Sequence, residues 1–213
     1  MTVRNSHEKR DLNSTNPSTS EPAPITLSKR ALDITLALMA GILLLIPMLI
    51  IGALVRLSSP GPALYWSDRV GANNRIFRMP KFRSMRTDAP VVATHLLTQP
   101  DAYVTPVGKF IRRASLDELP QLWSIIKGDM SFVGPRPALY NQYDLIKMRT
   151  EKGVHTLLPG LTGWAQINGR DELDLETKVA FDAEYLQRKS LLLDIKILWL
   201  TFVQALGGQG VSH

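Results

Sequence analysis

The sequence predicts an α+β fold that is mainly helical and begins with a membrane-embedded segment. Three observations support this prediction. An uncharged apolar run extends from Ile34 to Val55, short extended stretches follow it, and the second half of the chain contains long stretches of helical character. With 213 residues the chain is long enough for one compact domain and an appendage. It contains no cysteine, which excludes disulfides, thiolate zinc sites and thiol nucleophiles.

Charge and composition divide the chain into four parts. Residues 1–27 are rich in Ser, Thr, Asn and Pro and are predicted to be a disordered tail. Residues 28–57 hold the membrane segment, residues 58–206 the cytoplasmic domain, and residues 207–213 a flexible tail. Much of the formal net charge of +6 falls between Arg56 and Arg113. This distribution favours anionic partners, namely phosphate esters, acidic lipid head groups or nucleic acid.

The apolar run of 22 residues would be about 33 Å long as a helix, close to the roughly 30 Å of a bilayer core. Basic residues lie on both flanks, with Lys29 and Arg30 before the run and Arg56 after it. Pro47 predicts a break between a half at Ile34–Ile46 and a half at Met48–Val55. Two arrangements remain open: a re-entrant helix–break–helix hairpin that returns to the cytoplasmic face, and a kinked transmembrane helix.

The elements after the membrane segment follow from turn signals and periodicity. We expect extended pieces at Ala63–Trp66 and Arg75–Met85, with Lys81 and Arg83 on one side of the second and with Pro80 excluding a central strand. A solvated basic face is the alternative for these two cations. The remaining expectations are a loop at 88–107 with a short helix near Val91–Leu97, a helix at Leu119–Lys127 ending at Gly128, a helix at Ala138–Lys152, a short strand at Trp164–Ile167, a helix at Leu173–Lys189 with Lys178 and Asp182 on one face, and an apolar helix at Leu191–Leu206 that lies in the headgroup plane or packs on the core.

Two adjacent carboxylates, Asp117 and Glu118, follow Arg112 and Arg113 at the expected start of a helix. Carboxylates in this position stay ionised and lie near backbone N–H groups that favour phosphate oxygens. The alternative is a capping box between Ser115 and Glu118, which has no function beyond starting a helix. Pro120 favours a helix that begins near Leu119 and leaves the acidic pair in the preceding turn.

Arg136 stands between Pro135 and Pro137. The two prolines fix the backbone on either side, so little backbone entropy is lost when the guanidinium binds a phosphate through two hydrogen bonds. The alternative is a structural turn in which Arg136 pairs with a local carboxylate.

Six ordered motifs together resemble a known family, and the resemblance extends from about Ser28 to about Leu206. The motifs are Lys29-Arg30-Ala31-Leu32-Asp33, Lys81-Phe82-Arg83-Ser84-Met85, Ser115-Leu116-Asp117-Glu118-Leu119-Pro120-Gln121, Gly128-Asp129-Met130-Ser131, Gly134-Pro135-Arg136-Pro137 and Pro159-Gly160-Leu161-Thr162-Gly163-Trp164. They resemble the bacterial sugar transferases, and more narrowly the small monotopic polyprenyl-phosphate phosphoglycosyl transferases. Large members of the family carry an additional multi-span membrane domain, and this sequence resembles the minimal catalytic form.

The resemblance implies transfer of a sugar-1-phosphate from a UDP-sugar to undecaprenyl phosphate through a covalent aspartyl-phosphosugar intermediate, with release of UMP. This reaction is a first membrane step of polysaccharide and glycoconjugate synthesis. By the same resemblance Asp117 is the nucleophile and Glu118 helps to bind Mg²⁺. Arg136 would bind the diphosphate. Further candidates are Lys81, Arg83, Arg112 and Arg113 for the surrounding positive field, and Asp129, Asp182 and Arg170 as secondary site residues.

The resemblance also implies a re-entrant hairpin in the bacterial inner (cytoplasmic) membrane, with the catalytic domain facing the cytoplasm. The expected partners are the UDP-sugar, undecaprenyl phosphate and membrane lipids, and no nucleic acid. The sequence leaves open whether the chain forms a homo-oligomer and which sugar it transfers. Two other functions remain as alternatives: a hydrolase of nucleotide sugars or lipid diphosphates, and a non-catalytic membrane scaffold that binds acidic lipids.

Overall fold

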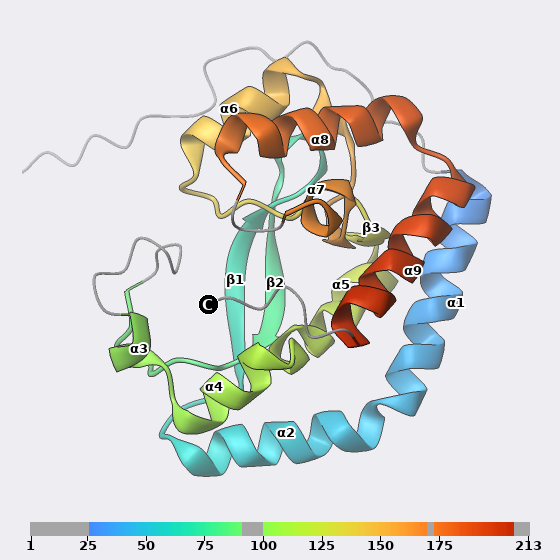
Figure 1. Cartoon of the computed structure of the whole chain (residues 1–213). Coiled ribbons are helices and arrows are strands. Elements are labelled where there is room, and N and C mark those ends of the chain that lie inside the picture. Colours follow the sequence, from blue (N-terminus) through green and yellow to red (C-terminus); the bar gives the residue numbers. More distant parts are fainter. Residues whose placement is uncertain (1–25, 91–99, 170–172, 207–213) are drawn as a thin grey trace, which may run out of the picture.

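The computed structural model of the chain describes residues 26–90, 100–169 and 173–206 (Figure 1). Arg170, the helix expected at Val91–Leu97 and both predicted tails, apart from Thr26 and Leu27, lie outside these residues. The described helices are α1 (Leu27–Leu43), α2 (Leu45–Ser58), α3 (Pro100–Tyr103), α4 (Pro106–Arg113), α5 (Leu122–Lys127), α6 (Tyr143–Glu151), α7 (Trp164–Ile167), α8 (Leu175–Arg188) and α9 (Leu191–Leu206). Short 3₁₀ segments are η1 (Ala72–Asn74), η3 (Leu116–Gln121) and η4 (Val154–Thr156), and the strands are β1 (Leu64–Val70), β2 (Ile76–Phe82), β3 (Ser131–Val133) and β4 (Gly160–Thr162). The predicted mixed, mainly helical fold is confirmed.

Helices α1 and α2 are bent by 64° relative to each other. The break lies at Leu44, so the prediction of a break at Pro47 is wrong by one helical turn. Proline has no N–H to donate to the carbonyl four residues earlier, and its ring clashes with that carbonyl, which here belongs to Leu43. Helix α1 therefore ends at Leu43, and Pro47 occupies the first turn of α2, where N–H groups have no partner within the helix.

By length and composition, no single described helix could cross a bilayer, whereas α1 and α2 taken together could.

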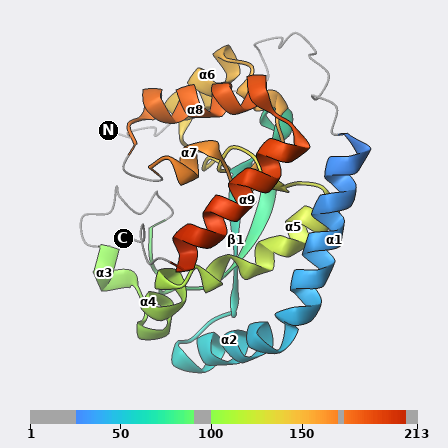
Figure 2. The same ribbon diagram turned by 45° about the vertical axis from the view of Figure 1, so that its right-hand side comes forward.

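Strands β1 and β2 form an antiparallel hairpin that runs through the middle of the molecule, between α6 and α8 at one end and α2 and α4 at the other (Figures 1 and 2). Pro80 is tolerated because each strand of this sheet is an edge strand. Strand β1 continues to Val70, beyond the predicted end at Trp66. Strand β2 ends at Phe82, so Arg83 lies outside it.

The hairpin is the centre of two apolar clusters. Met79 of β2 packs with Ala37 of α1 and Ile125 of α5. Phe82, at the end of the same strand, packs with Val55 of α2 and Ile111 of α4. Because β2 contributes to both clusters, it links the bent helix pair to the segment that carries the acidic residues.

The second, parallel sheet pairs β3 with β4. An ideal Cβ on Gly160 would lie 2.1 Å from the Gly134 nitrogen, so only glycine permits this approach of the two backbones. The strand expected at Trp164–Ile167 is helix α7 instead, and that prediction is wrong. Strand pairing is completed earlier, at Gly160–Thr162, and the Trp164 indole donates a hydrogen bond of 2.9 Å to Glu184 on α8.

Helix α6 begins at Tyr143, not at Ala138 as expected. The backbone before it pairs with the hairpin, because the Val70 N–H donates to the Ala138 carbonyl at 2.9 Å. Helix α8 agrees with its prediction to within two residues, and α9 has the predicted bounds. One side of α9 packs on the core through Leu193 and Ile197, while Trp199 on the same helix is exposed.

The basic start of α1 is attached to the rest of the molecule. Lys29 Nζ lies 2.7 Å from Asp194 Oδ2 on α9. Arg30 donates to the carbonyls of Ile125 and Ile126 at the end of α5. The buried Asp33 accepts a hydrogen bond from the Phe132 N–H at 3.0 Å. The contacts of Lys29, Arg30 and Asp33 therefore fix the direction in which α1 leaves the folded domain.

Candidate active site

The acidic pair lies in the 3₁₀ segment η3, directly before α5. Ser115 has a left-handed conformation (φ 54°), and its side chain makes no capping hydrogen bond. The Glu118 side chain is bound elsewhere. The capping-box interpretation is therefore wrong, whereas the expectation that the pair precedes the α-helix is confirmed.

Glu118 connects three separate segments of the chain. Its Oε1 atom accepts a hydrogen bond of 2.7 Å from Lys81 Nζ on β2 and one of 3.0 Å from Arg136 Nη2. Burial alone would raise the pKa of Glu118, but Arg136 and Lys81 together outweigh burial and hold this pKa well below its usual range. Glu118 is consequently an ionised carboxylate between two cations.

Asp117 has a different environment, although it is the next residue. Its side chain is buried, and no donor in the described part of the chain forms a hydrogen bond with its carboxylate. Burial raises the pKa of Asp117; Lys81 and Arg112 oppose this rise, and Glu118 adds to it. A desolvated carboxylate that is not tied by hydrogen bonds has its oxygen lone pairs available for a metal ion or an electrophile.

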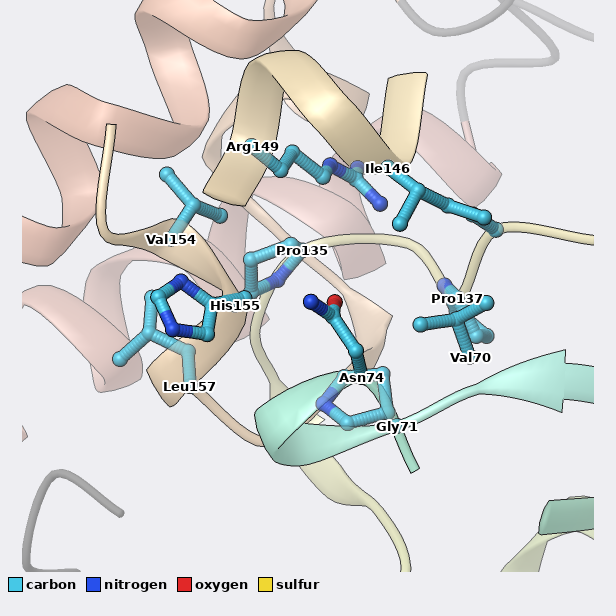
Figure 3. A pocket seen from close by; sticks show the side chains of 12 residues that line it. Val70, Gly71, Asn74, Pro135, Pro137, Ile146, Arg149, Val154, His155 and Leu157 are labelled. Carbon is cyan, nitrogen blue, oxygen red and sulfur yellow. The ribbon is translucent and has the colours of Figure 1, made fainter. Parts of the chain in front are cut away.

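Arg136 is held in place through its own backbone. Helix α6 contributes Arg149, whose Nη1 donates to the Arg136 carbonyl at 2.8 Å. In Figure 3 the Arg149 side chain extends towards the loop that carries Pro135 and Pro137. The same guanidinium is paired with Asp182 of α8 at 2.7 Å. The rigid arginine predicted from the two prolines therefore has a third support, and its side chain reaches Glu118.

One arginine near the acidic pair was missed by the sequence analysis. Arg69 of β1 donates from Nε to Ser67 Oγ at 3.0 Å and from Nη1 to the Pro137 carbonyl at 3.1 Å. Burial and the nearby Arg136 lower its pKa to about 10. It lines a small open hollow together with the following residues: Met79, Lys81, Glu118, Gln121, Arg136 and Pro137. Arg69 could have been predicted by extending the strand beyond Trp66, because side chains alternate between the two faces of a strand and Arg69 then lies on the same face as Tyr65.

Other predicted site residues lie away from this hollow. Arg83 is buried, and its guanidinium binds the carbonyls of Ser59 and Pro60, just after α2. Asp129 pairs with Lys127 at 2.9 Å. Arg112 and Arg113 form the last turn of α4; Arg112 acts electrostatically on Asp117, whereas Arg113 is exposed.

Asp182, another secondary candidate, is also placed away from the hollow. Its carboxylate pairs with Arg149 of α6. In the described part of the chain it forms no salt bridge with Lys178, which lies four residues earlier on α8. Arg149, which also binds the Arg136 carbonyl, connects Asp182 to the site.

Within residues 26–90, 100–169 and 173–206, no group of three or more acidic or histidine side chains is arranged to hold a metal ion. Mg²⁺ does not require such a group, because one or two carboxylates suffice when substrate phosphates and water complete its coordination. The adjacent carboxylates of Asp117 and Glu118 fit this requirement. Only one oxygen of Glu118, Oε1, accepts the two described hydrogen bonds.

A larger hollow of about 340 Å³, open to solvent, lies between α6 and the loop that carries Pro135 and Pro137, called here the proline loop (Figure 3). Its lining includes Pro135, Ile146, Arg149 and His155, and none of the predicted site residues. Arg149, whose charge could attract a ligand there, is already paired with Asp182. The smaller hollow beside Glu118, which contains predicted site residues, is therefore the candidate site.

Comparison with known proteins shows the family of the chain. A sequence model of the bacterial sugar transferase family matches residues 25–208, which include every residue discussed above. The chain belongs to the bacterial sugar transferase family. This membership confirms the resemblance inferred from the six motifs.

Three relatives show the range of this family. The chain is 45% identical over 187 residues to the undecaprenyl-phosphate glucose phosphotransferase of Komagataeibacter xylinus, a match that covers 82% of the chain and 35% of the relative. It is 44% identical over 183 residues to the UDP-glucose:undecaprenyl-phosphate glucose-1-phosphate transferase of Escherichia coli (strain K12), covering 82% and 39%. It is 38% identical over 190 residues to the exopolysaccharide production protein ExoY of Sinorhizobium fredii, covering 82% and 84%. The chain thus spans less than half the length of the first two relatives and most of the third.

Proposed function

We propose that this protein is a phosphoglycosyl transferase that moves a sugar-1-phosphate from a UDP-sugar to undecaprenyl phosphate. The observation that carries the proposal is the contrast within the acidic pair: a buried Asp117 without a described hydrogen bond next to a Glu118 bound by Lys81 and Arg136. The donor and the acceptor follow from the names of relatives, which specify UDP-glucose and undecaprenyl phosphate.

In the first step an Asp117 carboxylate oxygen attacks the phosphorus that bears the sugar. A new O–P bond forms, the P–O bond to the α-phosphate breaks, and its electron pair leaves with UMP. In the second step an oxygen of undecaprenyl phosphate attacks the same phosphorus. The bond to Asp117 breaks, which restores the carboxylate and yields the lipid diphosphate sugar. Neither step requires a proton transfer, because every nucleophile and leaving group is already an anion.

The cations of the site oppose the repulsion between a carboxylate and a phosphate. At a separation of 4 Å and an effective dielectric constant of 20, one pair of like charges repels by about 4 kcal/mol. Arg136 and Lys81 supply positive charge, and the two prolines and Arg149 hold Arg136 in place before substrate arrives. The Glu118 carboxylate holds both cations beside the acidic pair.

We further propose that Glu118, with Asp117 beside it, would hold Mg²⁺. When bound, the ion neutralises charge on the phosphates and acts as a Lewis acid. The residues of the chain bind and orient the diphosphate and present the nucleophile.

The bent helix pair is proposed to be a re-entrant hairpin in the bacterial cytoplasmic membrane, with the folded domain on the cytoplasmic face. Support comes from its two ends, which are both attached to that domain. Lys29 and Arg30 bind Asp194 and the end of α5, and Arg83 binds the carbonyls that follow α2. Between these ends, large apolar side chains are exposed: Leu38, Met39, Ile42, Leu43, Leu45, Ile46, Leu49, Ile50 and Leu54. Exposed apolar side chains of this extent indicate a membrane contact.

The test is to incubate the full-length protein with a panel of labelled UDP-sugars and Mg²⁺ without lipid. We expect one stoichiometric adduct with the matching sugar. The Asp117→Asn variant should form none, and the control variant Asp144→Asn, which changes an exposed carboxylate on α6, should form the full amount. An adduct that persists in Asp117→Asn would show that the nucleophile is another residue.

The alternatives give different products. Steady release of UMP in the absence of lipid phosphate would identify a hydrolase. A membrane scaffold would form no adduct, and its membrane binding would be the same with and without Asp117.

A further inference from the structure

The hollow beside Glu118 contains more positive than negative charge. Arg69, Lys81 and Arg136 line it together with a single carboxylate, that of Glu118. Counting the neighbouring Asp117 as well, three cations face two carboxylates. Cations that are brought together away from water repel each other unless anions separate them. The excess of positive charge therefore favours the binding of a further anion in this hollow.

Within the described part of the chain, Arg69 is the cation of this group that forms no salt bridge. Lys81 and Arg136 both form salt bridges with Glu118. Among the described residues, Arg69 forms none, and its hydrogen bonds go to a hydroxyl and a carbonyl, which carry no charge. A largely buried charge is normally neutralised by a partner. Glu118 also acts electrostatically on Arg69, but this carboxylate is shared with Lys81 and Arg136. A further anion would therefore complete the charge balance around Arg69.

The hydrogen bonds of Arg69 fix its direction and leave donors available. The register of the hairpin places it on the same face as Lys81, because its alternate neighbours Ser67 and Tyr65 lie opposite Met79 and Lys81. Nε and Nη1 are used within the protein, and Nη2 makes no hydrogen bond in the described part of the chain. A guanidinium has five N–H groups in a planar fork, so three remain for a ligand. Their geometry suits two parallel bonds to phosphate oxygens.

We propose that Arg69 binds the diphosphate of the nucleotide-sugar donor, as a third substrate-binding cation besides Lys81 and Arg136. The inference deepens the proposed function and rests on it. A purely structural role, in which Arg69 connects β1 to the proline loop, would need only its two hydrogen bonds and no charge beside Arg136. The two roles predict different kinetics.

The experiment compares Arg69→Gln, which removes the charge, with Arg69→Lys, which keeps the charge and loses the fork. Arg78→Gln is the matched control, because Arg78 belongs to the same hairpin, lies on the opposite face by register, and packs over the Trp66 ring at 5.5 Å. The first measurement is the UDP-sugar concentration that gives a half-maximal rate of adduct formation in the full-length protein. The second is calorimetric binding of UDP, with uridine as the ligand that lacks phosphate.

We expect Arg69→Gln to raise the half-saturating concentration by about 10- to 100-fold, as for the loss of hydrogen bonds to a charged group. UDP binding should weaken by a similar factor and uridine binding should not change. Arg69→Lys should lie between this variant and the wild type, and Arg78→Gln should stay within about twofold of the wild type.

The proposal is overturned if both Arg69 variants keep the wild-type half-saturating concentration and UDP affinity, even when their melting temperature or maximal rate falls. That result would make Arg69 a structural residue only. If Arg69→Gln does not fold, Arg69→Lys decides the question by the same two measurements. Failure of the proposed function is distinct, because the wild type would then form no adduct while UDP binding could still depend on Arg69.

Discussion

Arg149 of α6 and Asp182 of α8 form a buried ion pair, 2.7 Å between Nη2 and Oδ2, that also holds the backbone of Arg136. Both side chains are nearly inaccessible to solvent. The pair joins two helices to the loop whose arginine reaches Glu118. Because the guanidinium binds the Arg136 carbonyl through a different nitrogen from the one closest to Asp182, one residue serves both the core and the site.

We predict that Asp182→Asn lowers the free energy of unfolding by about 3 to 5 kcal/mol, since removing one partner leaves a buried charge uncompensated. The control is Asp88→Asn, which breaks the exposed pair with Arg86 and should change stability by about 0 to 1 kcal/mol. Thermal melting of the purified proteins measures both changes. Equal effects of the two variants would mean that the Arg149 pair is not buried in solution.

The raised pKa of Asp117 leads to a prediction about pH. In the proposed mechanism the carboxylate is the nucleophile, so adduct formation should fall as pH drops through the pKa of Asp117. Burial raises this pKa above the ordinary value of 3.8, and the decline should therefore begin at a higher pH than for an exposed aspartate. Lys81 lowers the pKa of Asp117, so Lys81→Met should move the midpoint further upward as well as slow the reaction.

Single-turnover rates of adduct formation, measured at saturating UDP-sugar across the acid range, give the two midpoints. A midpoint in Lys81→Met at or below that of the wild type would show that Lys81 does not stabilise the Asp117 carboxylate.

The predicted site residues that the structure brings together are recognisable from local signals in the sequence. Asp117 and Glu118 are adjacent, and Arg136 is bracketed by prolines, so a short stretch of sequence is enough to recognise each of them. Tertiary packing brings Glu118 and Arg136 close to Lys81, but each residue could be recognised as a candidate from its own stretch of sequence. Helix α9 was equally readable, because the stretch after Ser190 is strongly apolar, with Asp194 and Lys196 as its charged residues.

The failures concern non-local pairing. Arg69 was missed because the part of β1 after Trp66 is recognisable as a strand only from its pairing with β2, which the local sequence does not show. Trp164–Ile167 has the aromatic and β-branched residues of a strand, but the parallel pairing is decided by the close approach of Gly134 and Gly160. Arg83 carries the positive charge expected of a residue that binds phosphate. Only the fold shows that its guanidinium donates to backbone carbonyls instead.

Arg83 therefore provides a test between its two interpretations. We predict that Arg83→Met leaves UDP affinity within about twofold of the wild type, since the guanidinium binds the carbonyls that follow α2 and does not line the hollow. Stability should fall by about 1 to 3 kcal/mol, because partly buried carbonyls lose a charged donor. Calorimetry with UDP and thermal melting provide the two values. A tenfold loss of UDP affinity at unchanged stability would support the original expectation that Arg83 binds substrate.

The absence of cysteine makes the membrane topology directly testable, because a single introduced thiol is the only one in the protein. The two ends of the bent helix pair are attached to the same domain through Lys29 and Arg83, so we predict that both flanks lie on the cytoplasmic side. Ser28→Cys and Ser58→Cys, at exposed positions, should both react with a membrane-impermeant maleimide in inverted vesicles and neither should react in intact cells. Asp88→Cys, in the folded domain, is the reference for the cytoplasmic side. Labelling of either flanking cysteine from outside the cell would mean that the pair spans the membrane, and the attachment of both ends to one domain could then not hold in the bilayer.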